Sequence, residues 1–413
     1  MKLRKYGGLW ILAGGMVFSL VVPVRAWAHG ERSIMPVLRM RTVQFYDVEW
    51  DKTQIAVNEE VRIRGKFHLM EYWPENVGKP TRAYFNVAIP GPRLIRVEQR
   101  INGVPVFNHM EFQLGREYSF ETVLRGRQPG RWHIHPMING EKAGPMPGPG
   151  QWVEVTGNFA DFRDPVKLLT GEVIDLHTYG LSTVRFWHYL WVAVALFWLV
   201  WWLRRPSFIP RYRMLQQGDE ASLILPSDRT LGVVVLVGTI LIVALGVAVT
   251  LGKYYRTSVP LNADIHYIDP LPSEVSESIR IEPVKASYSV PERSIKLKVR
   301  ITNNHSEPIR FSEFSTVGVR FIESSLLGNY PLGQNYPEEL VAKNGLVVSP
   351  KNTVGPGETA EFDLDMTDAV WATEQLIDLA TAAGTSVAGL FFFHDASGKR
   401  HMVPFFTPIV PVF

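Results

Sequence analysis

Two long stretches without charged side chains interrupt an otherwise mixed pattern of apolar and polar residues. The first extends from about Phe186 to Leu203 and includes five tryptophans, and the second extends from about Leu231 to Leu251. Each has about the 18–20 apolar residues that a helix needs to cross a bilayer. A buried core helix is the alternative, but the length of both stretches and the arginines beside them favour a membrane. We therefore predict a transmembrane helix over residues 183–204 and another over residues 230–252.

The loop predicted between these helices, residues 205–229, is rich in arginine. Arginines stand in or beside it at Arg204, Arg205, Arg211, Arg213 and Arg229. Because positive charge accumulates on the cytoplasmic side of membrane proteins, we expect this loop to be cytoplasmic. The regions before and after the hairpin are then on the outer side.

The N-terminus shows a different apolar pattern. Lys2, Arg4 and Lys5 precede an apolar run from Leu9 to Val24, and Ala26-Trp27-Ala28 follows it. A basic segment, an apolar segment and a small-x-small motif in this order are typical of a secretory signal. We predict that residues 1–28 are a signal peptide and that cleavage leaves His29 as the N-terminus.

The rest of the chain alternates over short lengths, which is typical of strands. Apolar alternation between turn residues recurs from residue 29 to about 157 and again from about 278 to 413, as in Val61–Phe67 and Ser294–Asn303. Short strands at regular spacing favour β-sandwiches or small barrels. We predict two outer β-domains, residues 29–182 with a connector and residues 278–413, with a linker over 253–277. A short helix is expected over Thr367–Ala383.

Composition limits the chemistry. The net charge is only +3, so neither a nucleic-acid partner nor an acidic substrate is indicated. The chain has no cysteine, which excludes disulfides, blue-copper centres and iron–sulfur ligation. Any metal must therefore be held by histidine, carboxylate or backbone groups.

Three histidines point to such a metal site. Cleavage would give His29 a free α-amino group, whose pKa of about 7.7–8.0 lets a metal displace its proton at neutral pH. His133 and His135 are separated by one residue, so both would face the same side of a strand. Their nitrogens could then reach one ion at about 2.0–2.1 Å. An amine with three imidazoles favours copper over zinc. Glu31 could accept a hydrogen bond from a ligand, although a solvated surface carboxylate is the alternative.

The remaining histidines give weaker indications of a metal site. His68 is a lone histidine on a predicted strand, and His188 opens the first apolar stretch among aromatic residues, where packing is the expected role. No ligand spacing relates the other six to one another, namely His109, His177, His266, His305, His394 and His401. No serine–histidine–aspartate arrangement, glycine-rich phosphate loop or H-E-x-x-H motif is present, and no catalytic residue is assigned.

In its motifs the chain resembles the B subunit of the particulate methane and ammonia monooxygenases. The similar motifs occur in the same order along essentially the whole mature chain. They are His29–Ser33, Leu38–Trp50, Gly65–His68, Pro129–His135, Leu168–Glu172, Phe186–His188, Arg205–Pro210, Tyr288–Pro291, Glu313-Phe314 and Pro408–Pro411.

The resemblance implies two cupredoxin-like β-domains outside the membrane, joined by two transmembrane helices. It implies assembly with A and C subunits into a trimer of heterotrimers, and copper held by His29, His133 and His135. Some members pair a second histidine with the one that matches His68, but Gln44 stands at that position here. A two-histidine copper site at His68 is therefore not expected. The C subunit is a strong candidate for the chemical step in this family.

These observations lead to a functional hypothesis. The chain is expected to be the copper-binding B subunit of a monooxygenase in an inner or intracytoplasmic bacterial membrane, with both β-domains on the periplasmic side. The complex would hydroxylate methane to methanol, or ammonia to hydroxylamine, with O2 and a quinol-type donor. Methane is favoured only narrowly. A membrane-anchored copper carrier and a non-catalytic scaffold are the alternatives, although the 11 methionines do not cluster as copper-transfer patches do.

Overall fold

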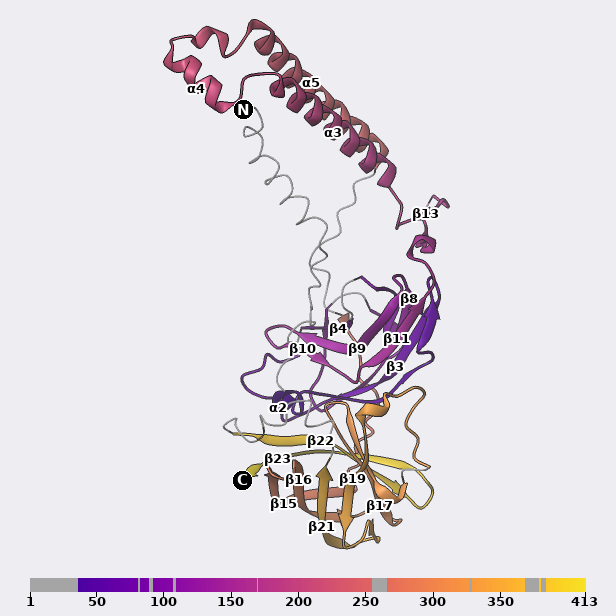
Figure 1. The fold of residues 1–413 in the computed structure, drawn as a ribbon. Coiled ribbons are helices and arrows are strands. Elements are labelled where there is room, and N and C mark those ends of the chain that lie inside the picture. Colours follow the sequence, from indigo (N-terminus) through magenta and orange to yellow (C-terminus); the bar gives the residue numbers. More distant parts are fainter. Residues whose placement is uncertain are drawn as a thin grey trace. The chain divides into compact units, whose positions relative to one another are not determined.

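The computed structural model of the chain is mainly β with two long helices (Figure 1). It describes residues 36–80, 82–88, 92–106, 109–168, 170–254, 266–326, 329–367, 379 and 384–413. The described residues of Met1–Phe162 and Asp264–Phe413 form one compact unit, and those of Arg163–Ala263 form another. The predicted signal peptide, His29 and Glu31 lie outside the described residues.

Two sheets form the N-terminal β region. The first has the strand order β1-β3-β8-β5-β6. Its strands are β1 Val43–Trp50, β3 Glu60–Leu69, β8 Glu117–Gly126, β5 Leu94–Ile101 and β6 Val104–Pro105. The second has the order β14-β7-β4-β9-β11-β2, and β10 pairs with β9. Its strands are β14 His266–Tyr267, β7 Met110–Glu111, β4 Ala83–Ala88, β9 Gly130–Gly140, β11 Gln151–Thr156, β2 Gln54–Ala56 and β10 Gly144–Pro147.

Apolar residues from both sheets form one core. Phe67 of the first sheet stacks on Phe85 of the second with ring centroids 6.1 Å apart, and Phe120 approaches Phe85 to 4.8 Å. Ile134 and Ile138 of β9 are fully buried in the same core. Because alternate residues of a strand face opposite sides, burial of these two isoleucines turns their neighbours on β9 to the other face.

The C-terminal β region is one ten-stranded sheet with the order β23-β22-β17-β18-β19-β21-β16-β15-β24, and β20 pairs with β17. A core rich in phenylalanine lies within it, and nearly every residue of β22 is buried, as expected for the apolar run at Gly389–Phe393. The strands are β15 Ile279–Ser289, β16 Ser294–Asn303, β17 Ile309–Thr316, β18 Val319–Glu323, β19 Val341–Ser349, β20 Thr353–Val354, β21 Thr359–Thr367, β22 Ser386–Asp395, β23 Arg400–Pro408 and β24 Val410–Val412.

The two β regions are hydrogen-bonded to each other. The Gln44 side-chain oxygen accepts from the Val317 backbone N–H at 3.0 Å, and the Asn335 amide donates to the Trp50 carbonyl at 2.8 Å. The Trp50 backbone N–H in turn donates to the Gln334 carbonyl. Strand β1 is therefore attached to the C-terminal region near both of its ends.

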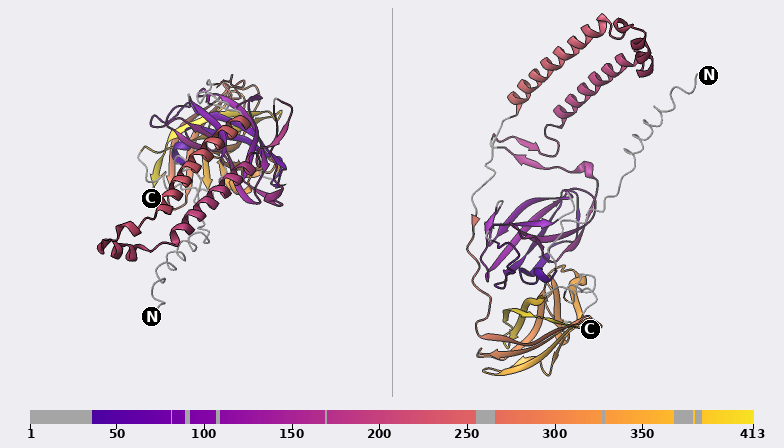
Figure 2. Two further views of the ribbon diagram at one scale, coloured as in Figure 1. Left: turned by 90° about the horizontal axis from the view of Figure 1, so that it is seen from above. Right: turned by 90° about the vertical axis from the view of Figure 1, so that its left-hand side faces the viewer.

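The second unit contains a helical hairpin. Helices α3 Leu181–Leu203 and α5 Pro226–Lys253 are long and apolar enough to cross a membrane, and they run antiparallel (Figures 1 and 2). Helix α4 Phe208–Gln216 lies between them in the chain. Both long helices begin five residues before the apolar stretches used to predict them, because polar first turns precede the apolar segments.

Polar contacts hold both ends of this hairpin. At one end Asp228 accepts hydrogen bonds from Trp201 Nε1 at 2.9 Å and from Arg205 Nε at 3.1 Å. At the other end the hydroxyls of Thr183 and Tyr254 lie 2.9 Å apart. Unlike most of the hairpin, the Asp228 carboxylate is nearly inaccessible, and these two side chains together with the Leu225 backbone N–H satisfy its buried charge.

The mainly β fold class with two membrane-length helices is thus confirmed. The predicted domain boundaries remain predictions, and most of the helix expected over Thr367–Ala383 falls outside the described residues. The remaining short elements are α2 Pro36–Arg39, β12 Pro165–Lys167, β13 Val173–Asp175, η2 Phe159–Asp161, η3 Glu220–Ser222, η4 Ser324–Leu326 and η5 Glu338–Leu340.

Candidate metal centre

Strand β9 brings His133 and His135 to the same face of its sheet. Ile134 between them is buried in the core, so the two imidazoles lie on the opposite face, where both are half-buried. In the strand register His133 is opposite Trp152 of β11 and His135 is opposite Ala88 of β4. The predicted arrangement of this pair on one strand face is therefore present in the structure.

The two imidazoles direct nitrogen atoms at each other. His135 Nε2 lies 3.0 Å from His133 Nδ1, and the ring planes are nearly perpendicular at 80°. His135 Nδ1 lies 3.0 Å from the Gly148 carbonyl oxygen, which can only accept, so Nδ1 carries the proton. The lone pair of His135 Nε2 consequently faces His133.

The segment after β10 confines His135. A Cβ at Gly150 would lie 2.2 Å from His135 Cε1, which is far below any tolerated contact. The Gly148 N–H donates to the Pro136 carbonyl at 2.7 Å and thereby holds its own carbonyl against the ring. Residues 144–150 consist of glycine and proline except for Met146. The absence of side chains at residues 148 and 150 was the signal available.

Aromatic packing fixes His133. Its ring stacks on Trp152 with centroids 4.6 Å apart and a 29° interplanar angle. The guanidinium of Arg131 lies over the same indole at 4.9 Å. Trp152 therefore orients His133 from the neighbouring strand, and sequence spacing alone does not reveal this contact.

The surroundings keep His135 neutral. Burial lowers the pKa of His135 from 6.5 to about 4, and the nearby imidazole of His133 acts in the same direction. The hydrogen bond to Gly148 opposes this change only in part. At neutral pH the ring is unprotonated at Nε2, which is the form that binds metal ions.

The donor set fits a copper ion. If two nitrogens each bind one ion at about 2.0–2.1 Å, and the two metal–nitrogen bonds are at right angles, the nitrogens are about 2.9 Å apart. The observed separation of 3.0 Å between His133 Nδ1 and His135 Nε2 matches that value. The third predicted ligand, His29, and the predicted hydrogen-bonding residue, Glu31, lie outside the described residues.

His68 has a different environment. It is buried, and its Nδ1 lies 3.1 Å from Oε1 of the equally buried Glu117. Gln44 is opposite His68 in the strand register, but its amide nitrogen donates to the Met40 carbonyl at 2.8 Å and its oxygen binds the Val317 N–H. Gln44 therefore joins two backbone segments by hydrogen bonds. The contact of His68 with Glu117 was not predicted from the sequence.

The fold brings together two of the remaining histidines that their sequence spacing does not relate. His305 and His401 show no ligand spacing along the sequence, yet the fold brings both rings close to the Asp395 carboxylate. Sheet pairing places β22 beside β23, and the turn after β16 brings in His305, so residues almost 100 positions apart converge. Local spacing is uninformative for ligands that come from different strands.

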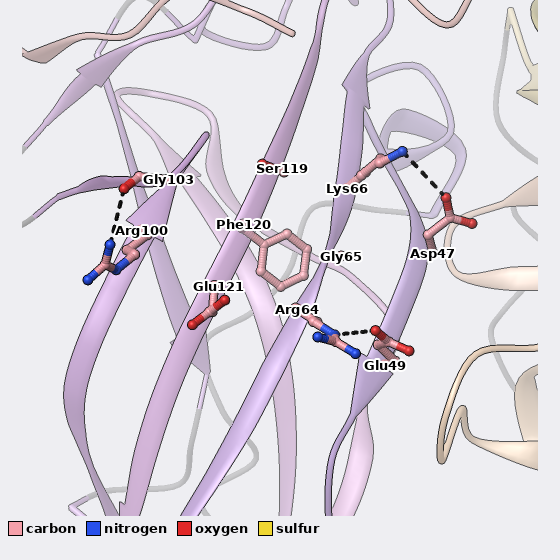
Figure 3. Close-up of a pocket in the computed structure, with 10 residues that line it drawn as sticks. All are labelled: Asp47, Glu49, Arg64, Gly65, Lys66, Arg100, Gly103, Ser119, Phe120 and Glu121. Carbon is pink, nitrogen blue, oxygen red and sulfur yellow. Dashed lines mark hydrogen bonds and ion pairs between the residues drawn. The ribbon is translucent and has the colours of Figure 1, made fainter.

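A hollow of about 330 Å³ lies on the other sheet of the N-terminal region, over β1, β3, β8 and β5 (Figure 3). Gly65 lines it beside Phe120, whose ring would be 3.0 Å from any Cβ at residue 65. Its charged groups are matched, Arg64 with Glu49 and Lys66 with Asp47. Among the residues drawn, no set of metal-binding nitrogens converges there, so we assign the candidate centre to β9.

The fold and the histidine pair define a β-sheet protein with a membrane-length helical hairpin and two metal-competent imidazoles. The sequence matches the family of monooxygenase B-subunit proteins over residues 30–413. The chain therefore belongs to the monooxygenase B-subunit family.

A named relative covers the same length. The chain is 39% identical over 414 residues to a Methylococcus capsulatus protein named particulate methane monooxygenase alpha subunit, with 100% of this chain and 98% of the relative aligned. The resemblance inferred from the motifs is thereby confirmed, and the chain is related to a subunit of a methane-oxidising enzyme.

Similarity to solved structures is lower. The cupredoxin domain of amoB from Nitrosocaldus yellowstonii matches 29% of this chain and 91% of its own, at 17% identity and a TM-score of 0.24. The D0-D1 domain of intimin matches 88% and 99%, at 8% identity and a TM-score of 0.17. Both TM-scores are too low to establish a shared fold, so the family assignment rests on the sequence matches.

Proposed function

We propose that this chain is the copper-binding B subunit of a membrane-bound monooxygenase that hydroxylates methane to methanol or ammonia to hydroxylamine. The observation that carries the proposal is the pair of nitrogens on His133 and His135, 3.0 Å apart on one strand face. Membership of the monooxygenase B-subunit family supplies the reaction class.

Each proposed ligand has a defined part. His135 offers Nε2 because Gly148 holds the proton on its Nδ1. His133, whose ring is stacked on Trp152, offers Nδ1 once the metal ion displaces the proton between Nδ1 and His135 Nε2. His29 completes the set with its imidazole and the α-amino group released by cleavage, and Glu31 orients a ligand by a hydrogen bond. Bound copper supplies a redox-active centre that these nitrogen ligands tune.

The overall reaction consumes O2, two electrons and two protons. One oxygen atom enters a C–H or N–H bond of the substrate, and the other leaves as water. A quinol-type donor supplies the electrons and protons. No residue of this chain is assigned to the chemical step, which we place in a partner subunit or leave to the assembled complex.

The helical hairpin supports a place in the membrane. We propose that α3 and α5 anchor the chain in an inner or intracytoplasmic bacterial membrane, with the arginine-rich loop inside and the β regions in the periplasm. The partners are the A and C subunits in a trimer of heterotrimers.

Native mass spectrometry of the complex, extracted gently from its own membrane, tests this proposal. A chain that begins at His29, carries copper and stays with two further subunits is the expected result. A chain that retains residues 1–28, or lacks copper, would overturn the three-histidine site. Copper without partner subunits would instead favour a membrane-anchored copper carrier.

A further inference from the structure

Three side chains with metal-binding atoms converge in the C-terminal β region, on a different sheet from the His133–His135 pair. They are His305, in the turn between β16 and β17, Asp395, the last residue of β22, and His401 on β23. One ligand atom of each lies within 4.8 Å of the other two. The proposed function uses none of these residues.

Hydrogen bonds fix the Asp395 carboxylate in one orientation. Its Oδ1 accepts from the Ser397 hydroxyl at 2.6 Å and from the backbone N–H groups of Ser397 and Lys399 at 3.0 and 2.9 Å. Its Oδ2 faces His401 Nε2 at 2.9 Å. The turn that follows β22 therefore saturates one oxygen and directs the other toward the imidazoles.

The two imidazoles approach that oxygen from different segments. Their ring centroids are 4.9 Å apart and their planes are inclined at 62°. Asp395 and His401 are 8% and 6% exposed, whereas His305 is half-buried and leaves a route for an ion. The proton shared by His401 Nε2 and Asp395 Oδ2 occupies the position that a metal ion would take over.

The turn that carries His305 is itself ordered by hydrogen bonds. The His305 N–H donates to the Asn303 side chain at 2.9 Å, and His305 Nδ1 accepts from the Glu307 N–H at 3.2 Å. Metal binding through Nε2 transfers the ring proton to Nδ1, so that second, long hydrogen bond has to open. A change in the 305–307 turn is thus part of the expected binding reaction.

A purely structural role would require only two of these three residues. The Asp395–His401 hydrogen bond alone braces the β22–β23 hairpin, and it needs no third group. That bond does not involve the His305 imidazole, which nevertheless lies beside the pair with its ring centroid 4.9 Å from that of His401. Two imidazoles and one carboxylate, with an open position for water, form a common ligand set for borderline divalent ions.

We propose that His305, Asp395 and His401 form a second metal site, which binds a borderline divalent ion such as Zn²⁺ or Cu²⁺. The site is independent of the copper centre assigned to His133 and His135, because the two share no strand. A bound ion would stabilise the C-terminal β region by cross-linking the β16–β17 turn to the β22–β23 hairpin.

Zinc binding to the purified complex tests this site, with Zn²⁺ alone as the probe. The complex is equilibrated with zinc, and bound metal per chain is measured for the wild type, H305Q, D395N and the control H394Q. His394 is the neighbour of Asp395, but its Nδ1 is 3.0 Å from the Ser312 hydroxyl, which a glutamine amide can also contact. We expect H305Q and D395N to lose one zinc per chain, and H394Q to retain it. H305Q should cause the same loss in a chain whose His133 and His135 are both replaced by alanine, which separates this site from the copper centre.

Thermal unfolding distinguishes a metal ligand from a structural brace. Zinc should raise the unfolding midpoint of the wild type and of H394Q but not that of H305Q. Since D395N also replaces the carboxylate oxygen that faces His401 Nε2 by an NH2 group, its midpoint should fall even without zinc. H305Q is therefore the variant that decides between the two roles. Equal zinc content in H305Q and the wild type, or an equal rise of their midpoints with zinc, would overturn the proposal.

Discussion

The imidazole of His135 occupies the space that any side chain at Gly150 would need. A Cβ at residue 150 would lie 2.2 Å from Cε1 and 2.5 Å from Nδ1 of that ring. Replacing Gly150 by alanine should therefore rotate the His135 imidazole away from the Gly148 carbonyl and from His133. We expect copper binding to weaken about 10–100-fold, the range found when the groups that orient metal ligands are removed. Competition titration with a copper chelator would measure it.

A second glycine provides the control for this change. A Cβ at Gly355 would meet only the far end of the flexible Glu358 side chain, at 3.2 Å. G355A should leave copper affinity unchanged. If G150A binds copper as tightly as G355A does, His135 is not held in the way described above.

Removing both imidazoles of the pair should abolish the proposed copper site. We expect His133→Ala with His135→Ala to lose the copper assigned to this subunit, because the N-terminal residue alone cannot supply the full nitrogen set. Metal analysis and electron paramagnetic resonance of the purified complex would detect the loss. His109→Ala is a suitable control, since that ring packs against Tyr84 away from the pair. Full copper in the double variant would contradict the assignment, and full activity without that copper would favour a scaffold role.

The stability of the metal-free protein should depend on pH through His135. Its pKa is lowered from 6.5 to about 4 in the folded chain. Between these values the unfolded chain binds a proton that the folded chain does not, so the free energy of unfolding falls as the pH decreases from 6.5 to 4. The full effect is as much as roughly 3 kcal/mol. Unfolding midpoints of the metal-stripped complex at pH 7 and pH 4.5 would show it, and a H135Q variant should show a smaller decrease. An equal decrease in both proteins would place the pH dependence elsewhere.

Gln44 should contribute to stability by joining the two β regions. It is 1% exposed, and its removal leaves the Val317 N–H and the Met40 carbonyl without their side-chain partner. We expect Gln44→Ala to destabilise the unit that contains both β regions by about 1–3 kcal/mol, the usual cost of an unsatisfied buried group. The unfolding midpoint would measure this, with Q334A as the matched control, because Gln334 makes a similar contact to a backbone carbonyl at an exposed position. Similar midpoints for the two variants would show that the Gln44 bonds add little.

Local patterns in the sequence were sufficient to predict the long helices, the strands and the His133–His135 pair of the candidate centre. Uninterrupted apolar stretches predicted α3 and α5, because crossing a bilayer requires a minimum apolar length. Alternation predicted the strands, and the one-residue spacing of His133 and His135 predicted a shared face, because the side-chain period of a strand is two. These features depend only on near neighbours along the chain.

Tertiary structure alone decided the partners of these residues. The contact of Gly150 with His135 and the pairing of His68 with Glu117 depend on which strands meet and in which register. The approach of His305 to His401 depends on the same kind of pairing. Register is set by packing of the whole core rather than by local spacing, since a slip of one residue turns every side chain to the opposite face. The sequence by itself therefore determined the membrane-length helices, the strands and the histidine pair, whereas the packed sheets decided which groups surround each histidine.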